Sequence, residues 1–483
     1  MHLVEQLIGG ARRGASNGAT FERINPVTGE VASRAPAGTV EDANAAVEAA
    51  AKAFPAWAAT PPAERRAKQY KAAELMDARA ADFIRIGVAE TGATGGWYGF
   101  NVMLAANMLR EAAAMTTQIG GEVIPSNYPG SLAMAVRQPA GVVLGIAPWN
   151  APVILGTRAV AVPLACGNTV VLKAAESCPG VHVLIGEILA EAGLGEGVIN
   201  VVTNAPADAP EIVAALIRHP KVRRVNFTGS TRVGRIVGKL AAAHLKPAVL
   251  ELGGKAPLLV LDDADLEAAR DAAAFGAFMN QGQICMSTER LVVDNSVADE
   301  FVGMLAAKAA TLKAGDPAQG NTPLGALVSA EGAALCRELI DDAVAKGARI
   351  ACGGQIDGVV MQPTVIDGVT RQMRLYSEES FGNLVSVIRV TGEEEAVAVA
   401  NDSDYGLSSA VFSRDVSRAW RVASRIESGI CHINGPTVHD EAQMPFGGVK
   451  DSGYGRFGGK AGVAEFTELR WITIQNGPRH YPF

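Results

Sequence analysis

The stretch Gly141-Val142-Val143-Leu144-Gly145-Ile146-Ala147 is a continuous apolar run, and its pattern decides the fold. A strand that is buried on both faces of a parallel sheet has this pattern, because helices cover both faces. Further apolar runs follow along the chain, and helical patterns separate them. The alternation predicts an α/β fold with a doubly wound sheet of the nucleotide-binding type. Strands are expected at 169–173, 198–202, 224–227 and 248–251, and helices at 153–162, 180–192, 209–218 and 232–243.

A mostly helical region is predicted before this sheet, and a second α/β region after it. Residues 1–38 look like a loose leading segment, and Thr39 with Asp42 forms a capping-box pattern that opens a helix. Residues 120–137 carry the pattern of a β-hairpin. The alternating tail at 466–475 looks like an edge strand that needs a partner sheet in an oligomer. Strands of the second region are expected at 257–261, 290–293, 365–366, 384–390, 409–412 and 429–434.

The composition argues against several classes of function. With 483 residues the chain is too long for one core, so two or three domains are expected. A formal net charge of −7 gives no basic surface for nucleic acid or for an anionic membrane. The six cysteines are scattered without a C-x-x-C pair, so neither a disulfide framework nor a metal site is predicted. With no visible signal peptide and no apolar run of membrane-spanning length, we expect a cytoplasmic protein.

One cysteine stands where a reactive thiol could be presented. Cys285 follows the Ala-rich helical run at 265–280 and Gly282, and it precedes a strand that includes residues 291–294. A thiolate held in such a turn can act as a nucleophile. The plainer alternative is an inert, small apolar side chain, which describes most cysteines.

Four positions follow the ends of predicted parallel strands: Asn150, Lys173, Gly229 and Glu251. Each has an ordinary explanation by itself, such as a helix cap, a solvated charge or an ion pair with Lys255. Ligands bind at this edge of parallel sheets. One shared site therefore explains the four positions better than four separate coincidences. At that edge Glu251 could act as a general base beside the thiol, and Asn150 could donate to an oxyanion.

Two of these positions have the chemistry to bind a dinucleotide. Residues 227–234 follow a strand and open a helix, where backbone N–H groups suit a phosphate, although the sequence is not G-x-G-x-x-G. Lys173 ends another strand and, with Glu176, could hold ribose hydroxyls. A carboxylate that faces the adenosine ribose would repel a 2′-phosphate, so Glu176 favours NAD over NADP.

Taken together and in order, the motifs resemble those of the aldehyde dehydrogenase family over nearly the whole chain. Residues 432–441 and the tail at 479–483 resemble the branch that oxidises vanillin, salicylaldehyde and benzaldehyde. One position departs from the family pattern: Asn383 stands where proline is usual after Phe-Gly. We expect this change to loosen its loop and to affect nicotinamide placement without abolishing activity. The matching motifs are Pro148-Trp149-Asn150, Lys173 with Glu176, Phe227-Thr228-Gly229-Ser230, Glu251-Leu252-Gly253-Gly254-Lys255, Gly282-Gln283-Ile284-Cys285, Glu378-Glu379-Ser380-Phe381-Gly382 and Pro445-Phe446-Gly447-Gly448-Val449-Lys450.

The resemblance implies NAD-dependent oxidation of an aromatic aldehyde to a carboxylic acid. Cys285 would attack the aldehyde and hold the acyl group as a thioester. Asn150 and the Cys285 backbone N–H would stabilise the oxyanion, and Glu251 would activate water. A homodimer or homotetramer is also implied. The implied domains are a Rossmann-type NAD-binding domain (1–119, 139–251 and 453–465), a catalytic domain (252–452) and a small β oligomerisation arm (120–138 and 466–483).

The same resemblance assigns residues to the cofactor and to the substrate. For the substrate it implies Trp97, Arg158, Met286 and Phe446. Trp97 clusters with Tyr98 and Phe100, which suits a flat aryl ring, although ordinary core packing explains the cluster equally well. Arg158 could orient a phenol or methoxy oxygen, or it could pair with a carboxylate. The implied cofactor contacts are Ile146, Trp149, Lys173, Glu176, Gly229, Ser230, Gly234, Leu252, Glu379 and Phe381.

Other functions remain open at this stage. The same scaffold could serve aliphatic aldehydes or semialdehydes, or a broad range of substrates. Transfer of the acyl group to coenzyme A is disfavoured by Glu251, because that reaction needs no water-activating base. A non-catalytic binding protein is disfavoured by the joint presence of Cys285, Glu251 and Asn150.

Overall fold

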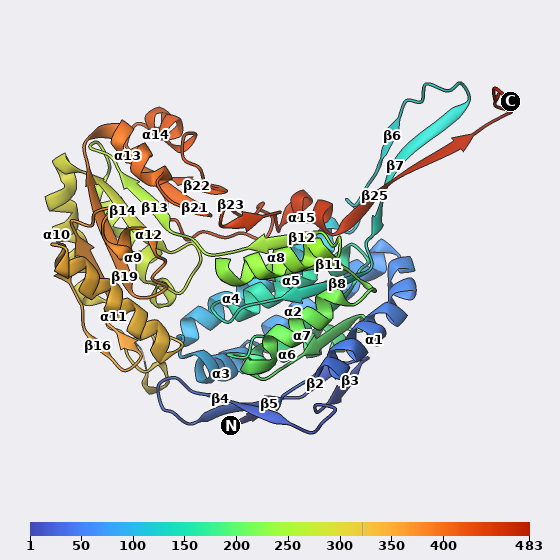
Figure 1. The fold of residues 1–483 in the computed structure, drawn as a ribbon, viewed down its shortest axis with the longest axis horizontal. Coiled ribbons are helices and arrows are strands. Elements are labelled where there is room, and N and C mark those ends of the chain that lie inside the picture. The colour runs from blue at the N-terminus through green and yellow to red at the C-terminus, as the bar shows by residue number, and fades with distance from the viewer. Residues whose placement is uncertain (321) are drawn as a thin grey trace.

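Two sheets, each covered by helices, make up most of the computed structural model, which describes residues 1–320 and 322–483 (Figure 1). The first sheet has five parallel strands in the spatial order β10-β9-β8-β11-β12. The chain order therefore reverses between β8 and β11, as in a doubly wound sheet, and the predicted fold class is confirmed. The strands are β8 (Val142–Ile146), β9 (Thr169–Lys173), β10 (Ile199–Val202), β11 (Val222–Thr228) and β12 (Ala248–Glu251).

Short antiparallel strands extend both edges of this sheet. At one edge β24 (Gly453–Tyr454) pairs with β12, so a late segment of the chain returns to the first sheet. At the other edge β2 (Gln6–Ile8) pairs with β10, and β3 (Ala11–Arg13) pairs with β2.

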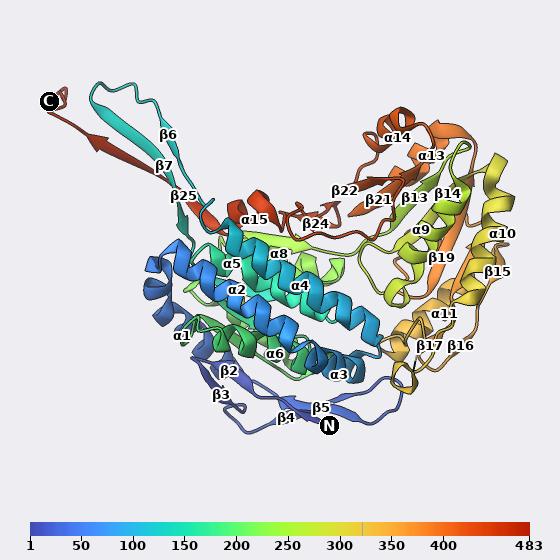
Figure 2. The ribbon, with the colours of Figure 1, turned by 180° about the vertical axis from the view of Figure 1, so that it is seen from behind.

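Helices cover both faces of the first sheet because its strands are apolar on both faces (Figure 2). One helix, α5, is buried along its whole length, so its single charged residue, Arg158, needs a partner inside the protein. One face carries α5 (Pro152–Ala165) and α6 (Pro179–Glu191), with α2 (Pro62–Ala78), α3 (Ala80–Thr91) and α4 (Gly95–Met115) packed with them. The other face carries α1 (Val40–Ala59), α7 (Ala209–Arg218) and α8 (Thr231–Ala243).

The leading segment is more ordered than predicted. It contains β1 (His2–Leu3), β4 (Thr20–Ile24) and β5 (Val31–Pro36), which form a three-stranded sheet, as well as β2 and β3. These strands are short, and β2 pairs with residues far along the chain, so local patterns do not reveal them. The capping box was predicted correctly, because the Thr39 backbone N–H donates to Asp42 Oδ2 at 2.9 Å and Thr39 Oγ1 accepts from the Asp42 N–H.

The second sheet has the order β15-β18-β19-β14-β13-β21-β22 and is parallel except for β15. Its main strands were predicted, whereas several short pieces were not. The strands are β13 (Ala256–Val260), β14 (Thr288–Asp294), β15 (Arg349–Cys352), β18 (Thr364–Asp367), β19 (Leu384–Val390), β21 (Ser408–Phe412) and β22 (Ile430–Ile433). Its helices are α9 (Leu266–Phe278), α10 (Asn295–Thr311), α11 (Ala330–Ala345), α12 (Arg374–Ser377), α13 (Gly392–Asn401) and α14 (Val416–Ala423). The short pieces β16 (Ile356–Asp357), β17 (Val360–Met361), β20 (Tyr405–Gly406), β23 (Val449–Lys450) and α15 (Gly459–Glu465) were not predicted.

A three-stranded arm projects from the body, and the C-terminus lies near its tip (Figures 1 and 2). The predicted hairpin supplies β6 (Glu122–Ile124) and β7 (Ser131–Pro139), and the tail supplies β25 (Thr467–Gln475). The tail strand pairs with β7 of the same chain over its whole length, from Thr467 opposite Pro139 to Gln475 opposite Ser131. The tail therefore finds a partner strand in its own chain, and its expected part in an oligomer stays a prediction.

The two main sheets meet end to end. The chain passes from the carboxyl end of β12 straight into the amino end of β13 through residues 252–255. The carboxyl edge of the first sheet therefore faces the amino edge of the second, and the candidate site lies between them. Among the described residues, no helix has both the length and the apolarity needed to cross a bilayer.

Candidate active site

The backbone before Cys285 makes an unusual turn. Helix α9 ends at Phe278, and then Asn280, Gln281 and Gly282 all adopt left-handed conformations, with φ of 49°, 57° and 70°. Two of these are not glycine, and non-glycine residues rarely adopt this conformation. A Cβ at Gly282 would collide with the carbonyl oxygen of Gly382. The turn is thus closely fitted to its surroundings, and it brings Cys285 to the boundary between the sheets.

Contacts on both sides of the turn hold Cys285 in place. A Cβ at Gly254 would collide with the Cys285 carbonyl oxygen, so only glycine fits between β12 and β13 at this point. Ser287 Oγ donates to the Gly282 carbonyl at 2.9 Å, and Thr437 Oγ1 donates to the Met286 carbonyl at 2.7 Å. The thiol position is therefore set by the backbone and does not depend on a mobile loop.

Asn150 lies beside the turn and is fixed through both its side chain and its backbone. Its Nδ2 donates to the Gln283 carbonyl at 3.0 Å. Its backbone carbonyl accepts two hydrogen bonds, one from Trp97 Nε1 and one from Asn280 Nδ2, each at 2.9 Å. The second N–H of the Asn150 amide is left for a group in the cavity that Asn150 and Cys285 both line. The Cys285 backbone N–H likewise has no acceptor among the described residues.

Glu251 ends β12 and faces the thiol from the first sheet. Its side chain is buried, and neither carboxylate oxygen accepts a hydrogen bond of normal geometry from the described residues. Burial raises its pKa to about 7, although the Arg158 charge and the Cys285 thiol act in the opposite direction. The alternative pairing of Glu251 with Lys255 is wrong, because Lys255 pairs with Glu289. A carboxyl without a structural partner suits proton transfer near neutral pH.

The environment of Cys285 favours the neutral thiol. Burial raises its pKa well above the usual value, and the neighbouring Glu251 raises it further. A thiol and a carboxyl that share an apolar space disfavour each other's ionisation. The other five cysteines are also free thiols, and the described residues contain no group of three or more His, Cys, Asp or Glu side chains that could hold a metal ion.

On the first-sheet side of Cys285 lies a cavity of about 260 Å³. Trp149 and Phe381 meet edge to face there, with ring centroids 5.8 Å apart. The N-terminus of α8 forms another wall, where Ser230 caps the helix. The predicted residues that line this cavity are Trp149, Asn150, Gly229, Ser230, Glu251, Leu252, Cys285, Glu379 and Phe381.

Four predicted cofactor residues lie at the same sheet edge but outside the lining of this cavity: Ile146, Lys173, Glu176 and Gly234. Ile146 pairs with Lys173 across β8 and β9, and Lys173 forms an ion pair with Glu176. Asn204 also donates to Glu176, at 2.9 Å. Gly234 lets Leu252 pack against α8, since a Cβ there would collide with the leucine side chain.

A buried ion pair shapes the loop that carries Glu379. Lys255 Nζ lies 2.7 Å from Glu289 Oε2, and both side chains are almost fully buried. The Glu289 carboxylate also accepts from the Ser380 N–H at 2.9 Å and from the Phe381 N–H at 3.2 Å. Glu379 in turn accepts from the Gly254 N–H, and burial raises the pKa of Glu379 to about 8.

Asn383 is tied into the structure at the position where proline is usual. Its Nδ2 donates to the Met361 carbonyl at 2.7 Å, and its own carbonyl accepts from the Thr364 N–H at 2.8 Å. The side chain is fully buried. These contacts argue against a loose loop, and the expected effect on nicotinamide placement stays a prediction.

On the second side of Cys285 lies a larger cavity of about 440 Å³ with a mostly apolar lining. All four predicted substrate residues line it: Trp97, Arg158, Met286 and Phe446. The Trp97 and Phe100 rings stack with centroids 5.6 Å apart. Tyr98 is not part of this wall, because it is buried in the core and its hydroxyl lies 3.0 Å from Thr91 Oγ1.

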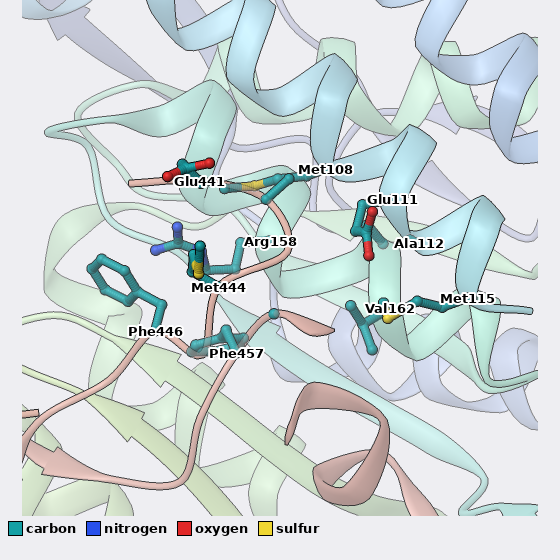
Figure 3. A pocket seen from close by; sticks show the side chains of 13 residues that line it. Met108, Glu111, Ala112, Met115, Arg158, Val162, Glu441, Met444, Phe446 and Phe457 are labelled. Carbon is teal, nitrogen blue, oxygen red and sulfur yellow. The ribbon is translucent and has the colours of Figure 1, made fainter. Parts of the chain in front are cut away.

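Arg158 reaches this cavity from α5 and forms an ion pair with Asp440, so the alternative of a carboxylate partner is correct. Its guanidinium also lies over the Phe446 ring, 4.1 Å from the centroid. Figure 3 shows Arg158 near Phe446, Met444 and Met108 in a third, small cavity.

Several residues that build the site were not predicted from the sequence. Asn280 and Glu289 are buried polar residues that hold Asn150 and the loop of Glu379, and Asp440 pairs with Arg158. Their common feature is burial without direct contact with the reacting atoms, which no local motif marks. Asn280 and Asp440 stand within quoted motifs, but only the fold shows what they contact.

The comparison with known proteins identifies the family. The model of the aldehyde dehydrogenase family matches residues 13–472. The chain belongs to the aldehyde dehydrogenase family. It is 68% identical over 479 residues to a vanillin dehydrogenase of Pseudomonas fluorescens, and the match covers 99% of each chain.

Two solved structures have the same fold. A salicylaldehyde dehydrogenase from Pseudomonas putida G7, complexed with salicylaldehyde, superposes with a TM-score of 0.99 at 49% identity and covers 100% of both chains. A betaine aldehyde dehydrogenase from Staphylococcus aureus, in complex with NAD⁺, has a TM-score of 0.95 at 34% identity, with 99% of this chain and 96% of that one covered.

The turn before Cys285 generates a first prediction. Gly282→Ala introduces a Cβ at a left-handed position, at a cost of roughly 1–2 kcal/mol, and also creates the collision with Gly382. We expect a lower Tm and a slower reaction of the Cys285 thiol with iodoacetamide, followed by peptide mass spectrometry. Gly303→Ala is the matched control, because Gly303 lies within α10 and a Cβ there meets nothing within 4 Å. Equal thiol reactivity in the two variants would show that the turn does not position Cys285.

Proposed function

We propose that this aldehyde dehydrogenase oxidises an aromatic aldehyde to a carboxylic acid with NAD and water. One observation carries the proposal: Cys285 lies at the junction of two cavities, one walled by aromatic side chains and one at the switch point of the nucleotide-type sheet. The similarity to a vanillin dehydrogenase and to a structure that contains salicylaldehyde supports the aromatic substrate.

The smaller cavity has features that fit NAD. The N-terminus of α8 offers backbone N–H groups and a positive dipole to a pyrophosphate. The Glu176 carboxylate lies outside this cavity at the same sheet edge and is about one quarter exposed, so it can accept from ribose hydroxyls and would repel a 2′-phosphate. Glu379 is a buried carboxyl that lines the cavity and accepts from the Gly254 N–H. It can also accept from a hydroxyl of the second ribose of NAD. A bound nicotinamide supplies the hydride acceptor.

Cys285 and Asn150 would carry out the first half of the reaction. The Cys285 thiol loses its proton to water, and the thiolate so formed adds to the aldehyde carbon. The oxygen of the adduct becomes negative. The free N–H of the Asn150 amide and the Cys285 backbone N–H are the donors available to stabilise it. Loss of hydride from the adduct leaves a thioester on Cys285.

Glu251 would carry out the second half. Its buried carboxyl accepts no hydrogen bond of normal geometry from the described residues, and burial raises its pKa to about 7, so it can take a proton from water near neutral pH. The resulting hydroxide attacks the thioester carbonyl, and the carboxylic acid leaves while the Cys285 sulfur is regenerated. A general base at this place favours water over coenzyme A as the acyl acceptor.

The larger cavity is suited to a flat ring. Trp97, Phe100 and Phe446 supply aromatic surface, and Met286 follows the nucleophile directly. The remaining N–H groups of Arg158 can donate to a ring hydroxyl or methoxy oxygen. A straight-chain aldehyde would leave much of this aromatic surface uncovered, which favours aryl aldehydes over aliphatic ones.

The nucleophile generates a second prediction. Cys285→Ala removes the thiol without adding bulk, so NADH formation from vanillin should fall to background. NAD binding, measured by calorimetry, should stay within about threefold of wild type, because the cofactor contacts are retained. Cys431→Ala serves as the control, since Cys431 lies in β22 and lines neither cavity. Residual turnover near that of wild type would overturn the assignment of Cys285.

Glu251 generates a third prediction. Glu251→Gln keeps the shape but removes the base, so thioester hydrolysis should slow about 10²- to 10⁴-fold. We expect a stopped-flow burst of NADH stoichiometric with sites, followed by slow turnover. In the wild type the ionised fraction of Glu251 falls as pH drops below its pKa of about 7, so steady-state turnover should fall there as well. A variant with neither a burst nor a loss of turnover would contradict the role of Glu251.

We also propose that the arm binds a second copy of the chain. Its exposed apolar side chains include Val123 (71% exposed), Leu469 (61%) and Trp471 (78%). Its outer strand β25 presents an unpaired edge. Such an apolar surface on a projecting sheet is costly in water unless it is covered.

The arm generates a fourth prediction. Trp471→Ser should weaken association and lower the molar mass measured by light scattering at micromolar concentration. Trp420→Ser is the matched control, because Trp420 is also exposed (68%) but lies on α14, outside the arm. An unchanged mass for Trp471→Ser, or an equal loss for both variants, would contradict the role of the arm.

A further inference from the structure

Arg158 carries a charge in a place where an unpaired charge would be costly. It is the one charged residue of α5, all of whose residues are buried, and its side chain is 6% exposed. It also lines the larger cavity, where it is the one lysine or arginine among the described lining residues. An unpaired guanidinium at this place would attract an anionic group on any molecule that entered.

Asp440 removes this attraction. Its Oδ2 accepts a hydrogen bond from Arg158 Nη2, and the Asp440 side chain is 9% exposed. Its other oxygen, Oδ1, is buried and accepts no hydrogen bond from the described residues. Arg158 is therefore the one polar partner that the described chain gives to this carboxylate.

The far side of Arg158 offers no space for another anion. The small cavity there has a volume of about 20 Å³, which is close to the minimum for one water molecule (Figure 3). Met108, Met115 and Val162 give it a largely apolar lining. Glu111 and Glu441 also line it, but in the described chain neither forms an ion pair with Arg158. Glu441 instead contacts His439, at 2.9 Å.

We infer that Asp440 is a specificity-determining residue: by neutralising Arg158 it keeps carboxylate-bearing aldehydes out of the cavity and favours aldehydes whose remainder is uncharged. This role rests on the proposed oxidation of aromatic aldehydes. An uncharged ring stacks on the aromatic walls and can still accept from the free N–H groups of Arg158. A carboxylate would lose its hydration, meet the Asp440 charge and find no unpaired lysine or arginine among the described lining residues.

A matched pair of substrates tests this role. 4-Carboxybenzaldehyde and 4-nitrobenzaldehyde are similar in shape but differ in charge at neutral pH. Because the ionised carboxylate also withdraws electrons less than the nitro group, the change in their ratio between variants is the main readout. For the wild type with NAD we expect a kcat/KM ratio, carboxy over nitro, of at most about 0.1. Asp440→Asn leaves Arg158 free to pair with the substrate carboxylate, so the ratio should rise at least about tenfold. The 3-substituted pair extends the test to a second position on the ring.

Two further variants distinguish the release of Arg158 for pairing with the substrate from a general loss of negative charge in the cavity. In Arg158→Gln/Asp440→Asn no cation is released, so the ratio should return to within about twofold of the wild-type value. Glu441→Gln removes a negative charge from the same cavity without freeing Arg158, and its ratio should also stay within about twofold of wild type. The role of Asp440 is overturned if the double variant keeps the gain or if Glu441→Gln matches Asp440→Asn.

The test remains decisive if Asp440→Asn does not fold, because a wild-type ratio near one would by itself overturn the role. In that case Arg158→Gln/Asp440→Asn, which buries no unpaired charge, must still turn over 4-carboxybenzaldehyde much less efficiently than 4-nitrobenzaldehyde. The proposed function is tested separately by wild-type oxidation of vanillin and 4-nitrobenzaldehyde. No turnover of either would overturn that function, whereas equal turnover of the matched pair would overturn only the role of Asp440.

Discussion

The site depends on the buried ion pair between Lys255 and Glu289. Lys255 directly precedes β13, Glu289 lies in β14, and the Glu289 carboxylate also accepts from the backbone ahead of β19. One pair of charges therefore joins the amino ends of three neighbouring strands. Removal of one member of such a pair typically costs about 3–5 kcal/mol, because the other charge is left buried. The same amino ends present Cys285 and Glu379 to the first sheet, so the pair fixes the geometry of both cavities.

A second constraint is the low polarity of the space around the thiol. Burial raises the pKa of Glu251 to about 7 and that of Glu379 to about 8, and it raises the pKa of Cys285 as well. Arg158 is the cation that opposes these shifts for Glu251 and Cys285, and Asp440 screens it. Burial therefore disfavours the charged form of each of these three groups. Glu251 in particular changes its protonation within the pH range in which a general base has to work.

The sequence predicted the parts of the structure that depend on local pattern. The buried strands β8 to β12 have continuous apolar runs, and Asn150, Lys173, Gly229 and Glu251 do lie at one edge of their sheet. The tail strand shows where local pattern stops, since its alternation was visible but its partner, β7, stands more than 300 residues earlier. Tyr98 shows a second limit, because helical spacing placed it beside Trp97 but could not say which of the two faces the cavity.

Long-range polar contacts account for most of what was missed. Asn280 holds the Asn150 backbone, and Asp440 neutralises Arg158. These pairs join segments that are 130 and 282 residues apart. Helical and strand periodicity cannot predict contacts between residues so far apart in the sequence. Asn383 is a related case, because its side-chain bond to Met361 compensates for the missing proline in a way that a motif comparison cannot detect.

The left-handed turn at residues 280–282 has a consequence for how this protein can change. Because neighbouring backbone leaves no space around the turn, most substitutions there would disturb the nucleophile itself. Much of the wall of the larger cavity comes from other elements, namely α4, α5 and residues 436–446, whereas Met279, Ile284 and Met286 belong to the segment of the turn. Reaction chemistry and a large part of the substrate cavity are thus encoded in separate segments of the chain. Directed evolution toward new aldehydes should therefore accumulate its useful substitutions in the walls and leave the turn unchanged.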